Sequence, residues 1–217
     1  MNNISLSSGN FDLERYTSPS KLIVTGRTTL NAINMCSDLI LDIEVKENAE
    51  FTLNLFDFDD RIKHNIKIKS ASNSKVNFII SFIAIKEYDL SIDAIVDGNN
   101  INNDVYIRGI NESSKVNIVL NGTALKKCKD SVINEYAKVI NTSDLATTLI
   151  PNLVVDTSLV TANHGISIGS IDDEVLFYIM SKGISRINAI KLIEEGFILS
   201  IMSDEIKDRI RNILLGR

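Results

Sequence analysis

Residues 51–58 read Phe-Thr-Leu-Asn-Leu-Phe-Asp-Phe, and apolar and polar side chains alternate along most of this stretch. The same alternation occurs in residues 39–45, Leu-Ile-Leu-Asp-Ile-Glu-Val, and in residues 65–69, Asn-Ile-Lys-Ile-Lys. It returns in residues 105–108 and 115–120. Because alternation places one set of side chains on each face of an extended chain, these segments predict half-buried β-strands.

Clusters of turn-forming residues separate these strands, at 46–49, 70–74, 97–100 and 111–114. Two strand beginnings nearly match, Ser74-Lys-Val-Asn-Phe78 and Ser114-Lys-Val-Asn-Ile118, and Phe51 holds the same place after an earlier turn. Short strands that recur every few tens of residues fit a β-solenoid, in which each coil buries its inner face on the next. They fit a β-sandwich nearly as well.

The periodicity becomes helical after Gly169. Ser170-Ile-Asp-Asp173 predicts a helix start with acidic residues in its first turn, and Gly183 predicts its stop. Ser185 predicts the cap of a second helix that runs to about Met202, and Ser203 opens a third. Apolar stripes on these segments indicate packing between the three helices rather than contact with a ligand.

These patterns divide the chain into three parts. We predict an N-terminal segment at 1–20, a β-core at 21–168 and a C-terminal helical domain at 169–217. The fold class is mainly β, followed by a small α-helical domain.

The composition excludes several classes of protein. The chain has 217 residues, 44% hydrophobic and 24% charged, with a net charge of -5 and no basic block, so it indicates a folded domain that binds no nucleic acid. The most apolar runs, 76–85 and 116–125, are too short to span a membrane. The first residues lack the features of a signal peptide, so we expect a cytoplasmic protein.

No motif of a common enzyme class is present. The sequence has no GxSxG elbow, no Walker motif and no GxGxxG, so nucleotide binding by those routes is not expected. Asp172-Asp-Glu174 is interpreted as a negatively charged helix start. The absence of Trp and an aromatic content of 6% argue against a polysaccharide-acting enzyme. The sequence therefore predicts a non-enzyme.

Individual chemistry-bearing side chains receive plain structural interpretations. His64 lies in a charged segment and is expected to be exposed, and Asp57, Asp59 and Asp60 are expected in a solvated turn. Cys128, between lysines, is expected to be an inert surface thiol, and Cys36 to lie in the core. The two cysteines form no metal-binding pair and are expected to be free.

Six segments near the C-terminus carry a resemblance. They are 151–153 (Pro-Asn-Leu), 163–169 (Asn-His-Gly-Ile-Ser-Ile-Gly), 171–178 (Ile-Asp-Asp-Glu-Val-Leu-Phe-Tyr), 181–184 (Ser-Lys-Gly-Ile), 189–193 (Ala-Ile-Lys-Leu-Ile) and 195–197 (Glu-Gly-Phe). In order, spacing and residue type they resemble the ending of the SufB/SufD proteins of iron–sulfur cluster assembly. The resemblance covers about a quarter of the chain, from Pro151 to Met202.

This resemblance implies a right-handed parallel β-helix core and a non-catalytic scaffold subunit of a SUF-type assembly complex. It implies that the C-terminal helices dock an ABC-type ATPase (SufC-like). It also implies that the β-helix pairs with a second copy, as a homodimer, or with a SufB-like chain, as a heterodimer. By the family motif, the partner-binding residues are Asp173, Phe177, Tyr178, Gly183, Gly196 and Phe197.

The histidine of the family motif falls on His164, which the resemblance makes a candidate iron ligand at the subunit interface. A structural role for His164 is an equal alternative. SufD-like members often carry a cysteine where this chain has Ala162, and SufB-like members carry a glutamate where it has Gly165. The chain therefore resembles SufD more than SufB. We expect no firmly bound cofactor, only a transient iron ion or cluster at the interface.

Two further expectations follow from the resemblance. Because the strand pattern begins near Lys21, the chain is interpreted as a short form without the family's N-terminal helical domain. An alternative function keeps the fold but makes the protein a regulatory or metal-trafficking homodimer outside cluster assembly.

Overall fold

The computed structural model describes residues 2–13, 20–34 and 36–216. Twelve strands precede three helices in the described chain. The strands are β1 (Asn2–Leu6), β2 (Gly9–Leu13), β3 (Ser20–Val24), β4 (Arg27–Ile33), β5 (Asp38–Val45), β6 (Glu50–Ser70), β7 (Lys75–Val96), β8 (Asn102–Asn111), β9 (Lys115–Ala124), β10 (Ser131–Asn141), β11 (Thr147–Val155) and β12 (Val160–Gly169). The helices are α1 (Asp173–Met180), α2 (Arg186–Leu199) and α3 (Asp204–Leu215).

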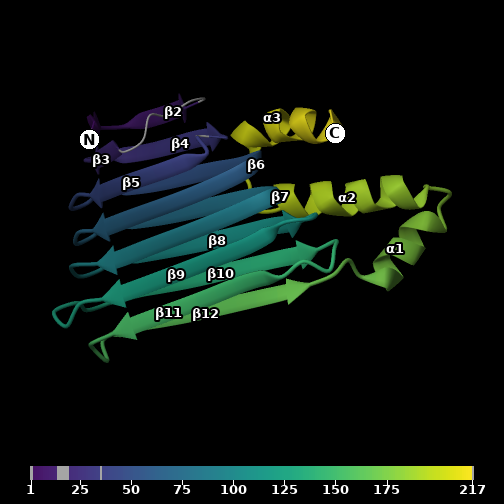
Figure 1. The fold of residues 1–217 in the computed structure, drawn as a ribbon. Coiled ribbons are helices and arrows are strands. Elements are labelled where there is room, and N and C mark those ends of the chain that lie inside the picture. The colour runs from purple at the N-terminus through teal and green to yellow at the C-terminus, as the bar shows by residue number, and fades with distance from the viewer. Residues whose placement is uncertain (1, 14–19, 35, 217) are drawn as a thin grey trace.

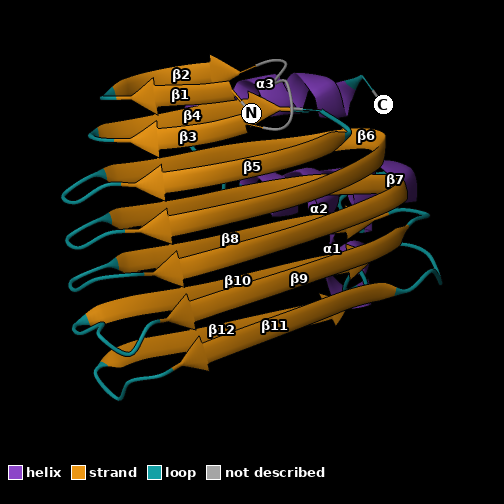
Figure 2. Ribbon diagram, turned by 60° about the vertical axis from the view of Figure 1, so that its left-hand side comes forward, coloured by secondary structure: helices purple, strands orange, loops and turns teal. Residues whose placement is uncertain are grey.

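The strands stack as the coils of a parallel β-helix (Figures 1 and 2). One face holds β2, β4, the first halves of β6 and β7, then β8, β10 and β12. The opposite face holds β1, β3, β5, the second halves of β6 and β7, then β9 and β11. All of these strand pairs are parallel, which confirms the β-helix and excludes the antiparallel sandwich.

The register of the strands explains the repeat seen in the sequence. Phe51 lies directly beside Val76, so their separation is one complete coil. Val116 lies instead beside Tyr88, on the face opposite to Val76. The two matching strand beginnings therefore occupy the two different faces of the β-helix, and only the shorter spacing measures a coil.

Strands begin earlier than the sequence pattern indicated. β1 and β2 both precede Lys21, and they form a first coil that pairs with β3 and β4 of the next. Their sequences, Asn-Asn-Ile-Ser-Leu and Gly-Asn-Phe-Asp-Leu, are five residues each and hold only two large apolar side chains apiece. Segments this short carry too little periodic signal to be recognised as strands.

The turns at one edge of the β-helix share a backbone conformation. Asn48, Asn73, Asn100 and Asp130 have φ angles of 62°, 58°, 55° and 51°, in the left-handed region. Asn and Asp tolerate this conformation better than other residues with a side chain, because their short polar groups bond locally. The amide of Asn100 also donates to Oδ1 of Asn73, 3.2 Å away in the neighbouring turn. These turns confirm the clusters predicted at 46–49, 70–74 and 97–100.

We predict that Asn73→Ala lowers the free energy of unfolding by about 1 kcal/mol, because alanine is strained at this φ. Asn73→Gly is expected to change it by less than about 0.5 kcal/mol. Asn65→Ala, at an exposed strand position of β6, is the matched control and is expected to be nearly neutral. Urea denaturation measures all three variants. Equal losses for Asn73→Ala and Asn65→Ala would contradict this account of the turn.

The lumen of the β-helix is filled by the apolar sides of the strands. Gly109 lies directly beside Phe82, and a Cβ at Gly109 would come within 2.0 Å of the Phe82 ring. The missing side chain leaves room for that ring, which stacks on Tyr88 with centroids 3.9 Å apart. Gly109 is thus a packing glycine, and any larger residue there forces the aromatic stack to move.

Helices α2 and α3 begin after Ser185 and Ser203, as the sequence predicted, whereas α1 begins after Asp172, two residues later than the predicted start at Ser170. The Asp172 side chain accepts hydrogen bonds from the backbone of Glu174 and Val175, and Ser185 caps α2 by accepting from the backbone of Asn188. Gly183, between them, has a φ of 85°. No helix of the described residues is long and apolar enough to cross a membrane.

The apolar stripes of α2 and α3 pack mainly against the β-helix, not only against one another as expected. Ile198, Ile206 and Ile210 cover outward-facing side chains of the strands that include Phe56 and Ile110. The Ser81 hydroxyl donates to the carbonyl of Ile198, 3.1 Å away. In Figure 1, α2 and α3 lie against one side of the strands and bring the C-terminus back toward the first coils, while α1 projects beyond them.

Candidate functional site

The β-helix is open at its last coil. β11 pairs only with β9, and β12 pairs only with β10, so each has one edge with no strand beside it among the described residues. The last coil lies at the bottom of the stack in Figure 2. Ile166 and Ile168 belong to the inward-facing side of β12, yet both are exposed. We call this surface, formed by β11 and β12, the open end.

His164 lies at the open end. It belongs to the inward-facing side of β12 and is exposed because no further coil covers it. Its neighbour in register on β10 is Glu135, whose side chain belongs to the same inner face. Ala162, two residues before His164, is half-buried beside Ile133. An imidazole and a carboxylate therefore stand on adjacent coils, one at the opening and one just inside it.

Glu135 is the most anomalous side chain of the lumen. It is fully buried, and neither carboxylate oxygen has a hydrogen-bond partner in the described structure. Burial raises the pKa of Glu135 to about 7. Across the lumen, Gly122 provides the space, because a Cβ there would come within 2.9 Å of Oε1 of Glu135. A buried carboxyl group without a partner is costly and is a recognised mark of a functional position.

Glu135 is absent from the site predicted from the sequence, although its place in the strand pattern is unusual. The inward-facing positions of β10 are Ser131, Ile133, Glu135, Ala137 and Val139. One charged residue in an otherwise mostly apolar alternation is the exception that strand periodicity makes visible. His164 follows the same parity on the next coil.

The raised pKa of Glu135 predicts a pH dependence of stability. The folded state keeps the proton up to about pH 7, whereas the unfolded state loses it near 4.5, so this group lowers stability progressively as pH rises from about 4.5 through 7. In Glu135→Gln, the decrease of the free energy of unfolding between pH 5 and 8 is expected to be smaller by roughly 2 kcal/mol. Glu47→Gln, in an exposed turn, is the control. An equal decrease of the free energy of unfolding with pH in the wild type, Glu135→Gln and Glu47→Gln would contradict the assignment.

The helical domain offers a second exposed surface. On α1, Phe177 is 74% exposed and Tyr178 is 63% exposed. The Lys182 amine lies 5.0 Å from the centre of the Tyr178 ring. Asp173 stands in the first turn of the same helix. Large aromatic side chains left in solvent on adjacent positions mark an interaction surface.

Phe197 and Gly196 occupy different environments from Phe177 and Tyr178. The Phe197 ring is half-buried against the β-helix, where the Arg108 guanidinium lies 4.9 Å and the Lys138 amine 5.9 Å from its centre. This contact holds α2 to the strands. A Cβ added at Gly196 would meet no atom within 4 Å, so this position on α2 faces open space.

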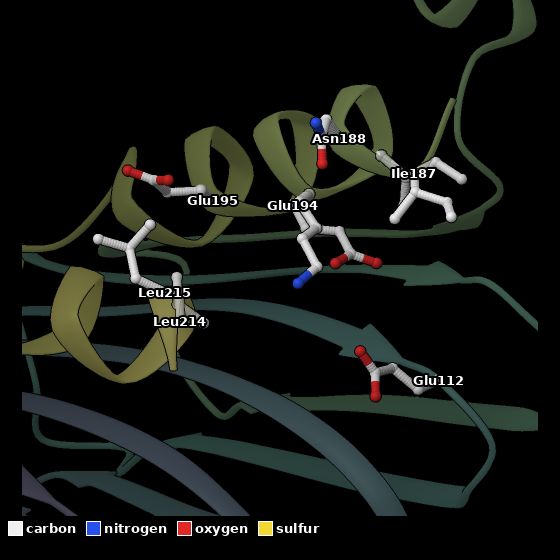
Figure 3. Close-up of a pocket in the computed structure, with 9 residues that line it drawn as sticks. Glu112, Ile187, Asn188, Glu194, Glu195, Leu214 and Leu215 are labelled. Atoms are coloured by element: carbon white, nitrogen blue, oxygen red, sulfur yellow. The ribbon is translucent and has the colours of Figure 1, made fainter. Parts of the chain in front are cut away.

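A cavity of about 660 Å³ lies between α2, α3 and the turn that follows β8 (Figure 3). Glu194 projects from α2, Glu112 lies across from it, and Leu214 and Leu215 close one end. Burial raises the pKa of Glu194, against the opposing charge of Lys191. The lining is mostly apolar with acidic groups at its walls, which suits a protein segment better than a small anion.

The expectation that His64 is exposed is wrong. His64 is buried in the lumen, where its Nε2 lies 3.2 Å from Oδ1 of Asp57. The Tyr88 hydroxyl donates to the other oxygen of Asp57, 3.1 Å away. Asp57 is therefore also buried, and not part of a solvated turn. Asp59 and Asp60 are exposed but belong to the continuous strand β6. The prediction was wrong because the charged side chains of this segment face outward, whereas His64 occupies an inward-facing position of the same strand.

The expectations for the cysteines also need correction. Cys128 is buried under the turn after β9, where its thiol donates to the carbonyl of Val96, 3.2 Å away, while the flanking lysines point outward. Cys36 is only half-buried at the edge of the core. Both are free. Across the described ranges, no three His, Cys, Asp or Glu side chains gather so as to hold a metal ion.

Comparison with known proteins agrees with this architecture. Residues 31–197 match the family described as SUF system FeS cluster assembly, SufBD core domain. A search of curated proteins gives no match. The matched range runs from β4 to α2 and includes the open end, α1 and the Phe197 contact. The chain therefore belongs to the SufBD core family of the iron–sulfur cluster assembly system.

Proposed function

We propose that this protein is a non-catalytic scaffold subunit of a SUF-type cluster assembly complex. The observation that carries the proposal is the SufBD match over residues 31–197, which joins the β-helix and the first two helices in one family unit. Each of the two exposed surfaces is assigned one role. The open end pairs with a second scaffold chain, and the helical domain docks the ATPase.

Pairing through the open end follows from its backbone. The free edges of β11 and β12 present unpaired N–H and C=O groups, which favour addition of strands from another chain. The inward-facing Ile166 and Ile168 add apolar surface that a second scaffold would cover. A second copy of this chain and a SufB-like chain both fit these requirements.

Docking of an ABC-type ATPase is assigned to α1 and the cavity beside α2. Phe177 and Tyr178 supply the aromatic anchors that dominate binding energy at many interfaces. Ile187, 70% exposed at the start of α2, extends the apolar surface to the mouth of the cavity (Figure 3).

Iron is the substrate that the scaffold carries, and the open end is the proposed place of its binding. His164 supplies an imidazole, a competent iron ligand, and Glu135 supplies a carboxylate one coil inside. Because the described residues of one chain bring no third ligand to this place, the site is completed by the paired scaffold.

We predict that His164→Ala reduces the iron retained by the scaffold–ATPase complex by roughly tenfold or more after anaerobic loading with Fe²⁺ and sulfide. Asn163→Ala, an outward-facing neighbour on β12, is the matched control and keeps the iron. Metal analysis after gel filtration measures the loss. Iron retention that is unchanged by His164→Ala overturns the role of the open end, and ATPase co-purification in the same samples shows whether the complex itself is intact.

A further inference from the structure

The outer surface of the last three coils carries an ordered grid of side chains. Along β8, β10 and β12 three outward columns stand in register. The first column is Asp104, Asn134 and Asn163, the second is Tyr106, Tyr136 and Gly165, and the third is Arg108, Lys138 and Ser167. Amide and carboxylate groups, aromatic rings and cations therefore lie side by side. We call this surface the tyrosine platform.

The middle column has a step. Tyr106 and Tyr136 stack with ring centroids 5.6 Å apart and planes 16° from parallel, and they are 36% and 39% exposed. The next position is Gly165, where a Cβ would come within 2.8 Å of the Tyr136 ring. The Tyr136 ring extends into the place where a third side chain would stand, and Gly165 brings no side chain that could cover the ring.

The third column places two cations side by side. Arg108 and Lys138 face each other on adjacent strands, and like charges in this arrangement destabilise a sheet. No carboxylate pairs with either of them in the described part of the chain, and their contact is with the Phe197 ring on α2. The Ser167 hydroxyl continues the column on the last coil. An anion placed between the two cations would relieve their repulsion.

These features line one groove of about 360 Å³, which Ile201 closes on the side of α2. We propose that the tyrosine platform binds a nucleoside phosphate, with the base on Tyr136 over Gly165 and the phosphate at Lys138, Arg108 and Ser167. The aromatic and cationic columns are two residues apart, about 7 Å along a strand. One small ligand reaches both columns only when it carries a planar ring and an anion together.

This site goes beyond the scaffold function and differs from the known nucleotide motifs. It uses stacking and paired cations on a sheet surface, in place of a glycine-rich loop at a helix start. The neighbouring column is a chain of hydrogen bonds, in which Asn163 donates to Asn134 and Asn134 donates to Asp104, and the exposed Asn163 at its end stands nearest to the edge of a base.

The test titrates the full-length chain with adenosine monophosphate by isothermal calorimetry, with adenosine and inorganic phosphate as partial ligands. We expect saturable binding of the nucleotide and at least tenfold weaker binding of each partial ligand. Lys138→Gln and Tyr136→Ala are each expected to weaken binding about tenfold or more, because each removes one of the two anchors.

Two further variants keep the result interpretable. Tyr136→Phe retains the ring and is expected to bind within about threefold of the wild type. Lys67→Gln, at an exposed position on the opposite face, makes the same change in net charge and is expected to leave binding unchanged. Circular dichroism confirms that each variant is folded. Absence of nucleotide binding, equal binding of phosphate alone, or equal affinities for Lys138→Gln and Lys67→Gln would overturn the proposal.

Discussion

The double variant Phe177→Ala, Tyr178→Ala is expected to lose roughly a hundredfold or more in affinity for the ABC-type ATPase that we propose as its partner, while it remains folded. The reason lies in the exposure of the two rings, which stand on α1 away from the main core. Aromatic anchors at the centre of an interface commonly contribute 2 kcal/mol or more each when truncated, about thirtyfold in affinity. Their removal takes little from the stability of the free chain.

Two controls separate docking from folding. Leu159→Ala removes an exposed apolar side chain from the loop between β11 and β12 and is expected to keep the affinity. Phe197→Ala removes the ring that holds α2 to the β-helix, so it is expected to lower the melting temperature as well as the affinity. Surface plasmon resonance against the immobilised ATPase measures all of them. Wild-type affinity for the double variant would move the docking surface away from α1.

The largest expected change in stability comes from Asp57→Ala, a loss of about 3–5 kcal/mol in the free energy of unfolding. Asp57 is fully buried, accepts the Tyr88 hydroxyl and pairs with His64. Removal of the carboxylate leaves both partners buried without their acceptor. Asp60→Ala, on the same strand, removes an exposed carboxylate that pairs with Lys86 and is expected to cost less than about 1 kcal/mol.

The same pair sets a pH signature. Burial alone lowers the pKa of His64, but the charge of Asp57 and its hydrogen bond to the ring raise it above 6.5 overall. The pair therefore contributes its full stability below about pH 6.5 and loses it as pH rises through the folded pKa.

In Asp57→Ala, burial is opposed only by the two smallest effects, the backbone hydrogen bond at Lys63 and the charge of Asp38, so the pKa of His64 is expected to fall below the unfolded value. The contribution of His64 then reverses its sign, and stability increases as pH rises through 6.5. Chemical denaturation between pH 5 and 8, compared with His64→Phe to isolate this group, measures the change. An unaltered slope in Asp57→Ala would show that the two side chains do not form an ion pair.

Much of the fold could be predicted from the sequence because its signals are local. Alternation marked β5, β6, β8 and β9, the asparagine-rich clusters marked turns, and Gly183 and Ser185 marked the ends of helices. The choice between β-helix and sandwich could not be made locally. It depends on whether neighbouring strands run parallel, and identical alternation is compatible with both.

The environments of single side chains were less predictable. His64 and Glu135 are ionisable residues that are buried at inward-facing strand positions, and their residue type alone predicts that they are exposed to solvent. Whether each of these residues faces the lumen or the solvent follows instead from its place in the alternation of its strand. The packing partner of α2 and α3 was also beyond the sequence, because an amphipathic stripe shows that a helix is covered without showing what covers it.

The central claim is that the chain is a scaffold that pairs at its open end and carries an ATPase on its helices. Native mass spectrometry of the chain mixed with its partner ABC-type ATPase tests it most directly. The account predicts an assembly that contains two scaffold chains and bound ATPase, and loss of the ATPase alone in the Phe177→Ala, Tyr178→Ala variant. A folded, monomeric chain that binds no ATPase at micromolar concentrations would contradict it.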